Sequence, residues 1–173
     1  MTRAGAPAHV VVIGVSGAGK TTVARSLADA TGRRFADADS FHSSAAKAKM
    51  AAGVPLTDDD RWPWLERLRD WMTARAAEGV PTALACSALR RVYRDVLDQA
   101  DGEVLFVLLD APRDVLEARV THRPGHFMPA DLLDSQLATL EPPGPGEHVL
   151  VLDATRGPEQ LARDAVDGLG GPT

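Results

Sequence analysis

Eight consecutive residues near the N-terminus leave this chain few possible folds: Gly14, Val15, Ser16, Gly17, Ala18, Gly19, Lys20 and Thr21. The preceding segment Val10–Ile13 is apolar and β-branched, which predicts a buried strand, and the following residues Thr22–Ala28 predict a helix. Glycines between a strand and a helix let backbone N–H groups and the helix N-terminus approach an anion without Cβ clashes. The run is therefore predicted to be a P-loop that holds the phosphates of a nucleoside triphosphate.

The P-loop residues have separate predicted tasks. The backbone from Gly14 to Thr22 is predicted to contact the nucleotide phosphates. Lys20 supplies a positive charge for the β- and γ-phosphate oxygens and is the first predicted catalytic residue. The Thr21 hydroxyl is placed to ligate Mg²⁺, which is the expected metal cofactor. The alternative interpretation is a glycine-rich turn that fits the pattern by chance, and the strand and helix on either side disfavour it.

Composition narrows the possible functions. A chain of 173 residues is long enough for one domain with a full core. The net charge of −5 gives no overall basic footprint for nucleic acid, which leaves only local basic patches as an alternative. No apolar run reaches the roughly 18 residues that predict a membrane span. Cys86 is the only cysteine, and the first hydrophobic run is the P-loop strand rather than a signal peptide, so a cytoplasmic protein is expected. A GTPase-like switch protein is disfavoured because no guanine-reading Asn/Thr-Lys-x-Asp segment occurs.

Apolar runs alternate with helical patterns along the whole chain. Strands are expected at His9–Ile13, Arg34–Ala38, Thr82–Cys86, Val104–Leu109 and His148–Leu152, and the longest helix at Arg61–Ala77. This alternation predicts the α/β class, with a parallel five-stranded sheet covered by helices on both faces in three α/β/α layers. Residues 1–173 are predicted to form a single domain with flexible ends at 1–8 and 168–173. Irregular structure is expected at 123–129 and 141–146, which are rich in Pro and Gly.

Polar side chains follow the predicted strands at their carboxyl ends, where ligands bind in an open α/β sheet. The residues expected to surround the phosphates are Asp37, Asp39 and His42 after the second strand, Ser87, Arg90 and Arg94 after the third, and Arg119, Arg123 and His126 after the fourth. A carboxylate with several arginines and histidines suits phosphoryl transfer to a small, polar, anionic acceptor.

Asp39 is the predicted catalytic carboxylate, because phosphoryl transfer to an alcohol needs a carboxylate near the attacking hydroxyl. The alternative is that Asp39 only caps the following helix, which is a common role for Asp. Asp37 points to the same side of an extended chain, where it either orients a Mg²⁺-bound water or lies on the surface.

A lid is predicted over approximately residues 119–135. Arg119 and Arg123 are four residues apart at the end of a helix and therefore share a face, from which they can close over the γ-phosphate. Pro124 and Gly125 break the helix next to His126, which provides a hinge. A solvated helix face and a rigid surface loop are the alternatives.

Three acidic residues, Asp58, Asp59 and Asp60, stand before Arg61. Asp59 or Asp60 is expected to cap the helix that follows, because acids at a helix N-terminus also complement its dipole. Arg61 can then face the cleft and pair with a substrate carboxylate.

Several longer segments resemble gluconokinases of the small P-loop type. The most specific are GVPLTDDDRWPWL from Gly53 to Leu65, CSALRRVYRD from Cys86 to Asp95, and GHFM from Gly125 to Met128. The P-loop itself is shared by many kinases. The chain departs from the family pattern at three positions, where the family usually has Gly, Pro and Asn: Ala38, Ser43 and Ala46.

The resemblance implies ATP-dependent phosphorylation of D-gluconate to 6-phosphogluconate, an adenylate-kinase-like fold with a mobile lid, and a homodimer. It also implies ATP and Mg²⁺ as cofactors, with Arg119 at the nucleotide and Arg123 as a catalytic residue of the lid. The implied substrate-binding residues are Asp39, His42, Arg61, Ser87, Arg90, Arg94 and His126. The alternative is a shikimate-kinase-like enzyme or another small-molecule P-loop kinase, which shares the P-loop and the Asp-x-Asp after the second strand.

Overall fold

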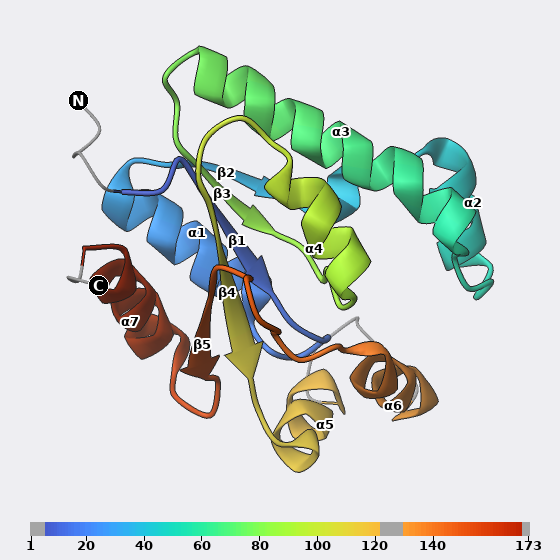
Figure 1. Ribbon diagram of the computed structural model, residues 1–173. Coiled ribbons are helices and arrows are strands. Elements are labelled where there is room, and N and C mark those ends of the chain that lie inside the picture. The colour runs from blue at the N-terminus through green and yellow to red at the C-terminus, as the bar shows by residue number, and fades with distance from the viewer. Residues whose placement is uncertain (1–5, 122–129, 171–173) are drawn as a thin grey trace.

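The computed structural model of the protein describes residues 6–121 and 130–170. At its centre lies a sheet of five parallel strands in the order β2-β3-β1-β4-β5 (Figure 1). The strands are β1 (His9–Ile13), β2 (Arg34–Asp37), β3 (Thr82–Ala85), β4 (Val104–Asp110) and β5 (Val149–Asp153). Every strand end lies within one residue of its predicted position, so the predicted parallel sheet is confirmed.

Helices cover both faces of the sheet, as predicted for three layers. Helices α1 (Lys20–Thr31) and α7 (Pro158–Gly170) pack on one face, and α3 (Asp58–Ala77) and α4 (Arg91–Asp98) pack on the other (Figure 1). The 3₁₀ helix η1 (Ala38–Phe41) and helix α2 (Ser44–Ala51) follow β2, and helices α5 (Arg113–Thr121) and α6 (Ala130–Thr139) follow β4.

The central strand β1 divides the core between the two faces. Val10 and Val12 contact the core under α1 and α7, whereas Val11 and Ile13 contact the core under α3 and α4. Successive side chains of a strand point to opposite faces, so a strand covered on both sides needs an unbroken apolar run. Burying each of these side chains contributes roughly 1.5–3 kcal/mol. The β-branched run therefore fixes the P-loop at the edge of a rigid core.

Helix α3 begins three residues earlier than predicted, and its cap differs from the prediction. Thr57 is the N-cap: its hydroxyl accepts a hydrogen bond from the Asp60 N–H, and the Asp60 carboxylate accepts one from the Thr57 N–H at 2.9 Å. This reciprocal capping box satisfies two N–H groups at the start of the helix. Asp60 thus takes part in capping, but the predicted N-cap position was wrong, because the apolar pattern starts only after the first helical turn.

Parts of the segments expected to be flexible, 1–8 and 168–173, lie within the described residues and make regular contacts. The Arg33 guanidinium donates to the carbonyl oxygens of Pro7 at 2.8 Å and Ala8 at 3.1 Å, which holds the residues before β1. Helix α7 continues through Gly168 to Gly170. Of the expected lid, residues 119–121 belong to α5 and 130–135 to α6, whereas 122–129 lie outside the described residues. None of the helices in the described ranges combines the length and apolarity needed to cross a bilayer.

Candidate active site

The P-loop turns from β1 into α1 with backbone geometry that favours glycine. Gly17 and Gly19 have φ angles of 85° and 96°, both in the left-handed region. A Cβ on Gly17 would lie 3.0 Å from the Leu116 carbonyl oxygen and 2.9 Å from the Val120 Cγ2, so this glycine also lets α5 pack against the loop. A Cβ on Gly19 would have no described atom within 4 Å. Gly19 is therefore required for the turn that begins α1 rather than for packing.

Thr21 and Asp37 meet where α1 begins beside the end of β2. The Thr21 hydroxyl donates to Asp37 Oδ2 at 3.3 Å. The other carboxylate oxygen of Asp37 accepts from the Asp39 N–H at 3.0 Å, which makes Asp37 the N-cap of η1. Asp37, and not Asp39, therefore performs the helix-capping role at this point. A hydroxyl beside a carboxylate offers the oxygen ligands that Mg²⁺ prefers, so this pair fits the predicted metal site.

The Asp39 carboxylate lies close to both the P-loop and His42. Asp39 is exposed at the surface, but neighbouring atoms partly desolvate its carboxylate. This desolvation and the negative charge of Asp37 raise the pKa of Asp39 above its ordinary value. The positive charge of Lys20, and that of His42 when its ring is protonated, act in the opposite direction. Asp39 and Lys20 are thus near enough to interact electrostatically. A carboxylate with a raised pKa next to a phosphate site can accept a proton from a hydroxyl.

His42 lies near Asp39, and its ring is held by stacking against Trp64. Its ring is parallel to the Trp64 ring, with the centroids 4.3 Å apart, and Trp64 Nε1 donates to the Ala38 carbonyl at 2.7 Å. Burial lowers the pKa of His42, which favours the neutral ring. Its Nδ1 atom is buried and has no hydrogen-bond partner among the described residues. Leaving such a group unpaired costs about 1–3 kcal/mol, so a ligand hydroxyl that bonded it would gain affinity.

Asp58, Arg61, Arg90 and Tyr93 form a group that we call the arginine cluster. The guanidinium carbons of Arg61 and Arg90 lie 5.6 and 5.5 Å from the centre of the Tyr93 ring. Asp58 accepts from Arg90 at 3.0 Å, from Arg61 at 3.4 Å and from the Tyr93 hydroxyl. The Tyr93 hydroxyl and the two cations hold the pKa of Asp58 below its ordinary value. The two predicted arginines are therefore brought together, and they are already arranged to bind a carboxylate.

The prediction that Arg94 binds substrate does not agree with its position. The side chain is 1% exposed, and each of its five N–H groups has a protein acceptor. Two bonds go to the Glu147 carboxylate, at 2.6 and 3.2 Å. The other three go to the carbonyl oxygens of Ala88, Leu89 and Glu141. Arg94 is thus a structural residue with no donor left for a ligand.

The bonds of Arg94 support a strained turn after β3. Ala88 has a φ of 40°, which is unfavourable for a residue with a side chain, and it lies between Ser87 and Leu89. Ser87 is beside the P-loop, because its carbonyl accepts from the Gly14 N–H at 3.4 Å. Arg94 therefore holds the turn that places Ser87 and Arg90 at the site. Sequence alone could not separate this buried arginine from Arg90, one helical turn earlier.

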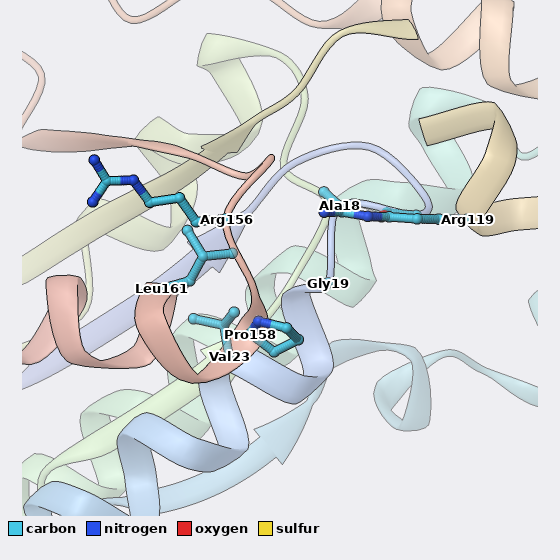
Figure 2. Close-up of a pocket in the computed structure, with 8 residues that line it drawn as sticks. Ala18, Gly19, Val23, Arg119, Arg156, Pro158 and Leu161 are labelled. Atoms are coloured by element: carbon cyan, nitrogen blue, oxygen red, sulfur yellow. The ribbon is translucent and has the colours of Figure 1, made fainter. Parts of the chain in front are cut away.

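A cavity of about 260 Å³ lies beside the P-loop (Figure 2). Arg119, at the end of α5, donates to the Gly17 carbonyl at 3.5 Å and to the Ala154 carbonyl, which ties it to the P-loop and to the loop after β5. Sequence reasoning missed Arg156 and Pro158 here, because no motif brings the start of α7 to the P-loop. The lining residues are Gly17, Ala18, Gly19, Val23, Arg119, Arg156, Pro158 and Leu161.

The three departures from the family pattern have local structural roles. The Ser43 hydroxyl accepts from the Ala46 N–H at 3.1 Å as the N-cap of α2, and Ala46 is buried behind it. Ala38 is also buried. Two further predicted site residues, Arg123 and His126, lie outside the described residues.

Comparison with known proteins places this geometry in context. The family model described as an AAA domain matches residues 10–143. The chain is 44% identical to the gluconokinase of Gluconobacter oxydans (strain 621H), over 92% of this chain and 90% of that protein. The structure is similar to that of a gluconokinase from Sinorhizobium meliloti 1021, with 41% identity, a TM-score of 0.84, and coverage of 93% of this chain and 90% of that one.

The structure is also similar to that of a sugar kinase from Janibacter sp. HTCC2649, with 54% identity and a TM-score of 0.87 over 94% of this chain and 95% of that one. A shikimate kinase from Acinetobacter baumannii is 20% identical, with a TM-score of 0.55 over 92% of this chain and 90% of that one. This last likeness shows the fold alone.

Proposed function

The chain belongs to the gluconokinase family, and from this premise we propose how its residues carry out the ATP-dependent phosphorylation of D-gluconate. The product is 6-phospho-D-gluconate. The observation that carries this function is the 44% identity to a gluconokinase over 92% of the chain. A shikimate-kinase-like activity is disfavoured because only the fold is shared with the shikimate kinase.

The P-loop and the cavity beside it are the proposed ATP site. Backbone N–H groups of the loop face the phosphates, and Lys20 follows the charge that develops on the γ-phosphoryl group. The adenine base is assigned to the cavity, because Pro158 offers an exposed apolar contact and the flat Arg119 guanidinium can stack on a ring. The hydrogen bonds of Arg119 to the P-loop and to the loop after β5 support this assignment.

Mg²⁺ is the proposed metal, held by the Thr21 hydroxyl and, through a water, by the Asp37 carboxylate. The 3.3 Å contact between these two groups supports the assignment, because it places two hard oxygen ligands together at the start of α1. When bound, the ion would neutralise part of the charge of the triphosphate. The protein's own contribution here is to fix both oxygens beside the P-loop.

D-gluconate is proposed to lie between Asp39 and the arginine cluster. Arg61 and Arg90 would pair with its carboxylate, in the way that they now pair with Asp58. The unpaired Nδ1 of His42 would bond a sugar hydroxyl. Asp39 would accept the proton of the attacking hydroxyl as the new oxygen–phosphorus bond forms and the bond to ADP breaks. Its raised pKa supports this role.

The remaining assignments rest on the sequence. Arg123 and His126 are proposed to contact the transferring phosphoryl group and the sugar acid from a closing lid, which would exclude water from the site. Hydrogen exchange checks this: amides 122–129 should gain protection when gluconate and a non-hydrolysable ATP analogue bind together, and unchanged exchange would contradict a lid. A homodimer and a cytoplasmic location are proposed from the same resemblance and composition.

A coupled ADP-release assay tests the function itself. ATP and Mg²⁺ are supplied with gluconate, other aldonates, shikimate or nucleoside monophosphates in parallel. Gluconate should give the highest kcat/KM, and omission of Mg²⁺ should abolish turnover. Phosphorylation of shikimate without phosphorylation of gluconate would overturn the proposal.

A further inference from the structure

The peptide group between Val15 and Ser16 is held at both of its polar ends. Its carbonyl oxygen, on Val15, accepts from Lys20 Nζ at 3.0 Å. Its N–H, on Ser16, donates to the side-chain oxygen of Gln136 at 2.8 Å. A peptide group is planar and trans, so its C=O and N–H point in opposite directions and can only turn together. The bond to Gln136 therefore sets the direction in which the carbonyl meets Lys20.

Gln136 reaches the P-loop from a helix that is anchored on both sides of it. It lies on α6, 120 residues further along the chain than Ser16. One turn earlier, Leu133 is buried in the core beneath α1 and α7. Just beyond the helix, the Glu141 N–H donates to the Leu89 carbonyl at 2.8 Å, and the Glu141 carboxylate pairs with Arg90 at 3.2 Å. The position of Gln136 is thus fixed by the core and by the residues next to the arginine cluster.

We propose that Gln136 is a positioning residue for phosphoryl transfer, acting through the Val15–Ser16 peptide on Lys20. The assignment rests on the proposed function, in which Lys20 stabilises charge on the γ-phosphoryl group. Ser16 offers an N–H, so the Gln136 atom facing it must be the oxygen. Donation by this N–H also makes the Val15 carbonyl a stronger acceptor, because linked hydrogen bonds polarise one another. The ammonium has three N–H groups, so Lys20 can keep its carbonyl partner while contacting phosphate oxygens.

Removal of the acceptor should therefore misplace Lys20 without emptying the substrate site. Gln136→Met keeps the length of the side chain and removes its hydrogen bond. We expect kcat to fall about tenfold, because a misplacement of about 1 Å can cost about 10²-fold and the loss of one hydrogen bond should shift Lys20 by less than that. The gluconate KM should change less than about twofold. Gln136→Glu keeps an acceptor oxygen and should restore much of kcat. Gln99→Met, at the end of α4, is the matched control and should leave kcat unchanged.

A double-mutant cycle with Lys20→Ala measures how much of the effect of Gln136 on kcat is transmitted through Lys20. In that background, Gln136→Met should cost less than about twofold in kcat, because the group on which Gln136 acts is gone. An equal tenfold loss in both backgrounds, or a single variant with unchanged kcat, would overturn the proposal. Thermal unfolding checks the fold of each variant, and Gln136→Ala replaces the Met variant in the cycle if the latter does not fold. The wild-type rate on gluconate tests the proposed function separately, because the cycle compares only variants.

Discussion

The proposed nucleotide side and the proposed acceptor side of this site are built in different ways. On the nucleotide side, eight consecutive residues supply backbone N–H groups and the side chains of Lys20 and Thr21. On the proposed acceptor side, Asp39, Arg61 and Arg90 come from separate segments, and ion pairs and ring contacts hold the two arginines. A backbone site depends on local geometry, whereas a side-chain site depends on every partner that orients it. Substitutions should therefore affect the two sides differently.

Replacement of Asp39 should damage the acceptor side most severely. Asp39→Asn keeps the shape of the side chain but removes the proton acceptor, so kcat for gluconate should fall about 10²–10⁴-fold. The dissociation constant of a non-hydrolysable ATP analogue, measured by calorimetry, should be largely retained. Asp29→Asn, on the exposed face of α1, is the control. If Asp39→Asn kept most of its activity, the proton acceptor would lie elsewhere.

Substitution of Arg94 tests how much the structure around the acceptor side depends on a buried residue that has no donor left for a substrate. Arg94→Met leaves the buried Glu147 carboxylate without its ion-pair partner, and only the hydrogen bond from the Gly144 N–H remains. Breaking a buried pair in this way costs about 3–5 kcal/mol of unfolding free energy. Urea unfolding measures the loss. Arg91→Met, which breaks an exposed 3.8 Å pair with Asp95 on the same helix, should change stability little. Equal effects of the two substitutions would contradict a structural role for Arg94.

Lys20 tests the nucleotide side. Lys20→Ala removes a cation that follows developing charge, and kcat should fall on the order of 10²-fold or more. Urea unfolding should show little change in stability, because the core contacts of β1 and α1 remain. Lys47→Ala, an exposed lysine of α2, is the matched control. Near-normal turnover of Lys20→Ala would remove Lys20 from the mechanism.

The smallest expected effect lies at the start of α3, which carries Arg61. The hydrogen bond from Lys49, with further bonds from Thr57, lowers the pKa of Asp60 from 3.8 to about 2. A lowered pKa in the folded state stabilises the protein above the ordinary pKa, and this stabilisation is lost as pH falls toward 2. The melting temperature of Asp60→Asn should therefore be below wild type at pH 7 and approach it near pH 2.

Asp59→Asn is the control for this pH dependence, because Asp59 lies in the same helical turn but outside the capping box. Its melting temperature at pH 7 should differ from wild type by less than that of Asp60→Asn. A difference for Asp60→Asn that did not shrink on acidification would contradict the assigned cause of its pKa.

The contrast between a contiguous site and one built from separate segments also explains what could be predicted from the sequence. The strands and the P-loop follow from contiguous patterns, so β1 was predicted to the residue and the other strand ends to within one. Arg61 and Arg90 were predicted as site residues, and the structure brings them together. The partner that joins them, Asp58, was considered only as part of an acidic run before a helix.

The features that sequence reasoning missed depend on contacts between distant segments. The partner of Arg94 is Glu147, which follows a loop rich in Pro and Gly and has no pattern of its own. Gln136 contacts a P-loop residue 120 positions away. Periodicity reports which face of an element is buried, but it does not report which side chain another element will meet. Such residues become visible only when the fold has placed them.

Arg61→Ala tests directly whether the acceptor side can lose affinity while the nucleotide side keeps it. Calorimetry gives the dissociation constants of D-gluconate and of a non-hydrolysable ATP analogue for this variant and for wild type. Loss of a charged hydrogen-bond donor to the substrate carboxylate should weaken gluconate binding about 10- to 100-fold, with the affinity for the ATP analogue changed less than about twofold. Unchanged gluconate binding, or an equal loss of affinity for both ligands, would contradict the account.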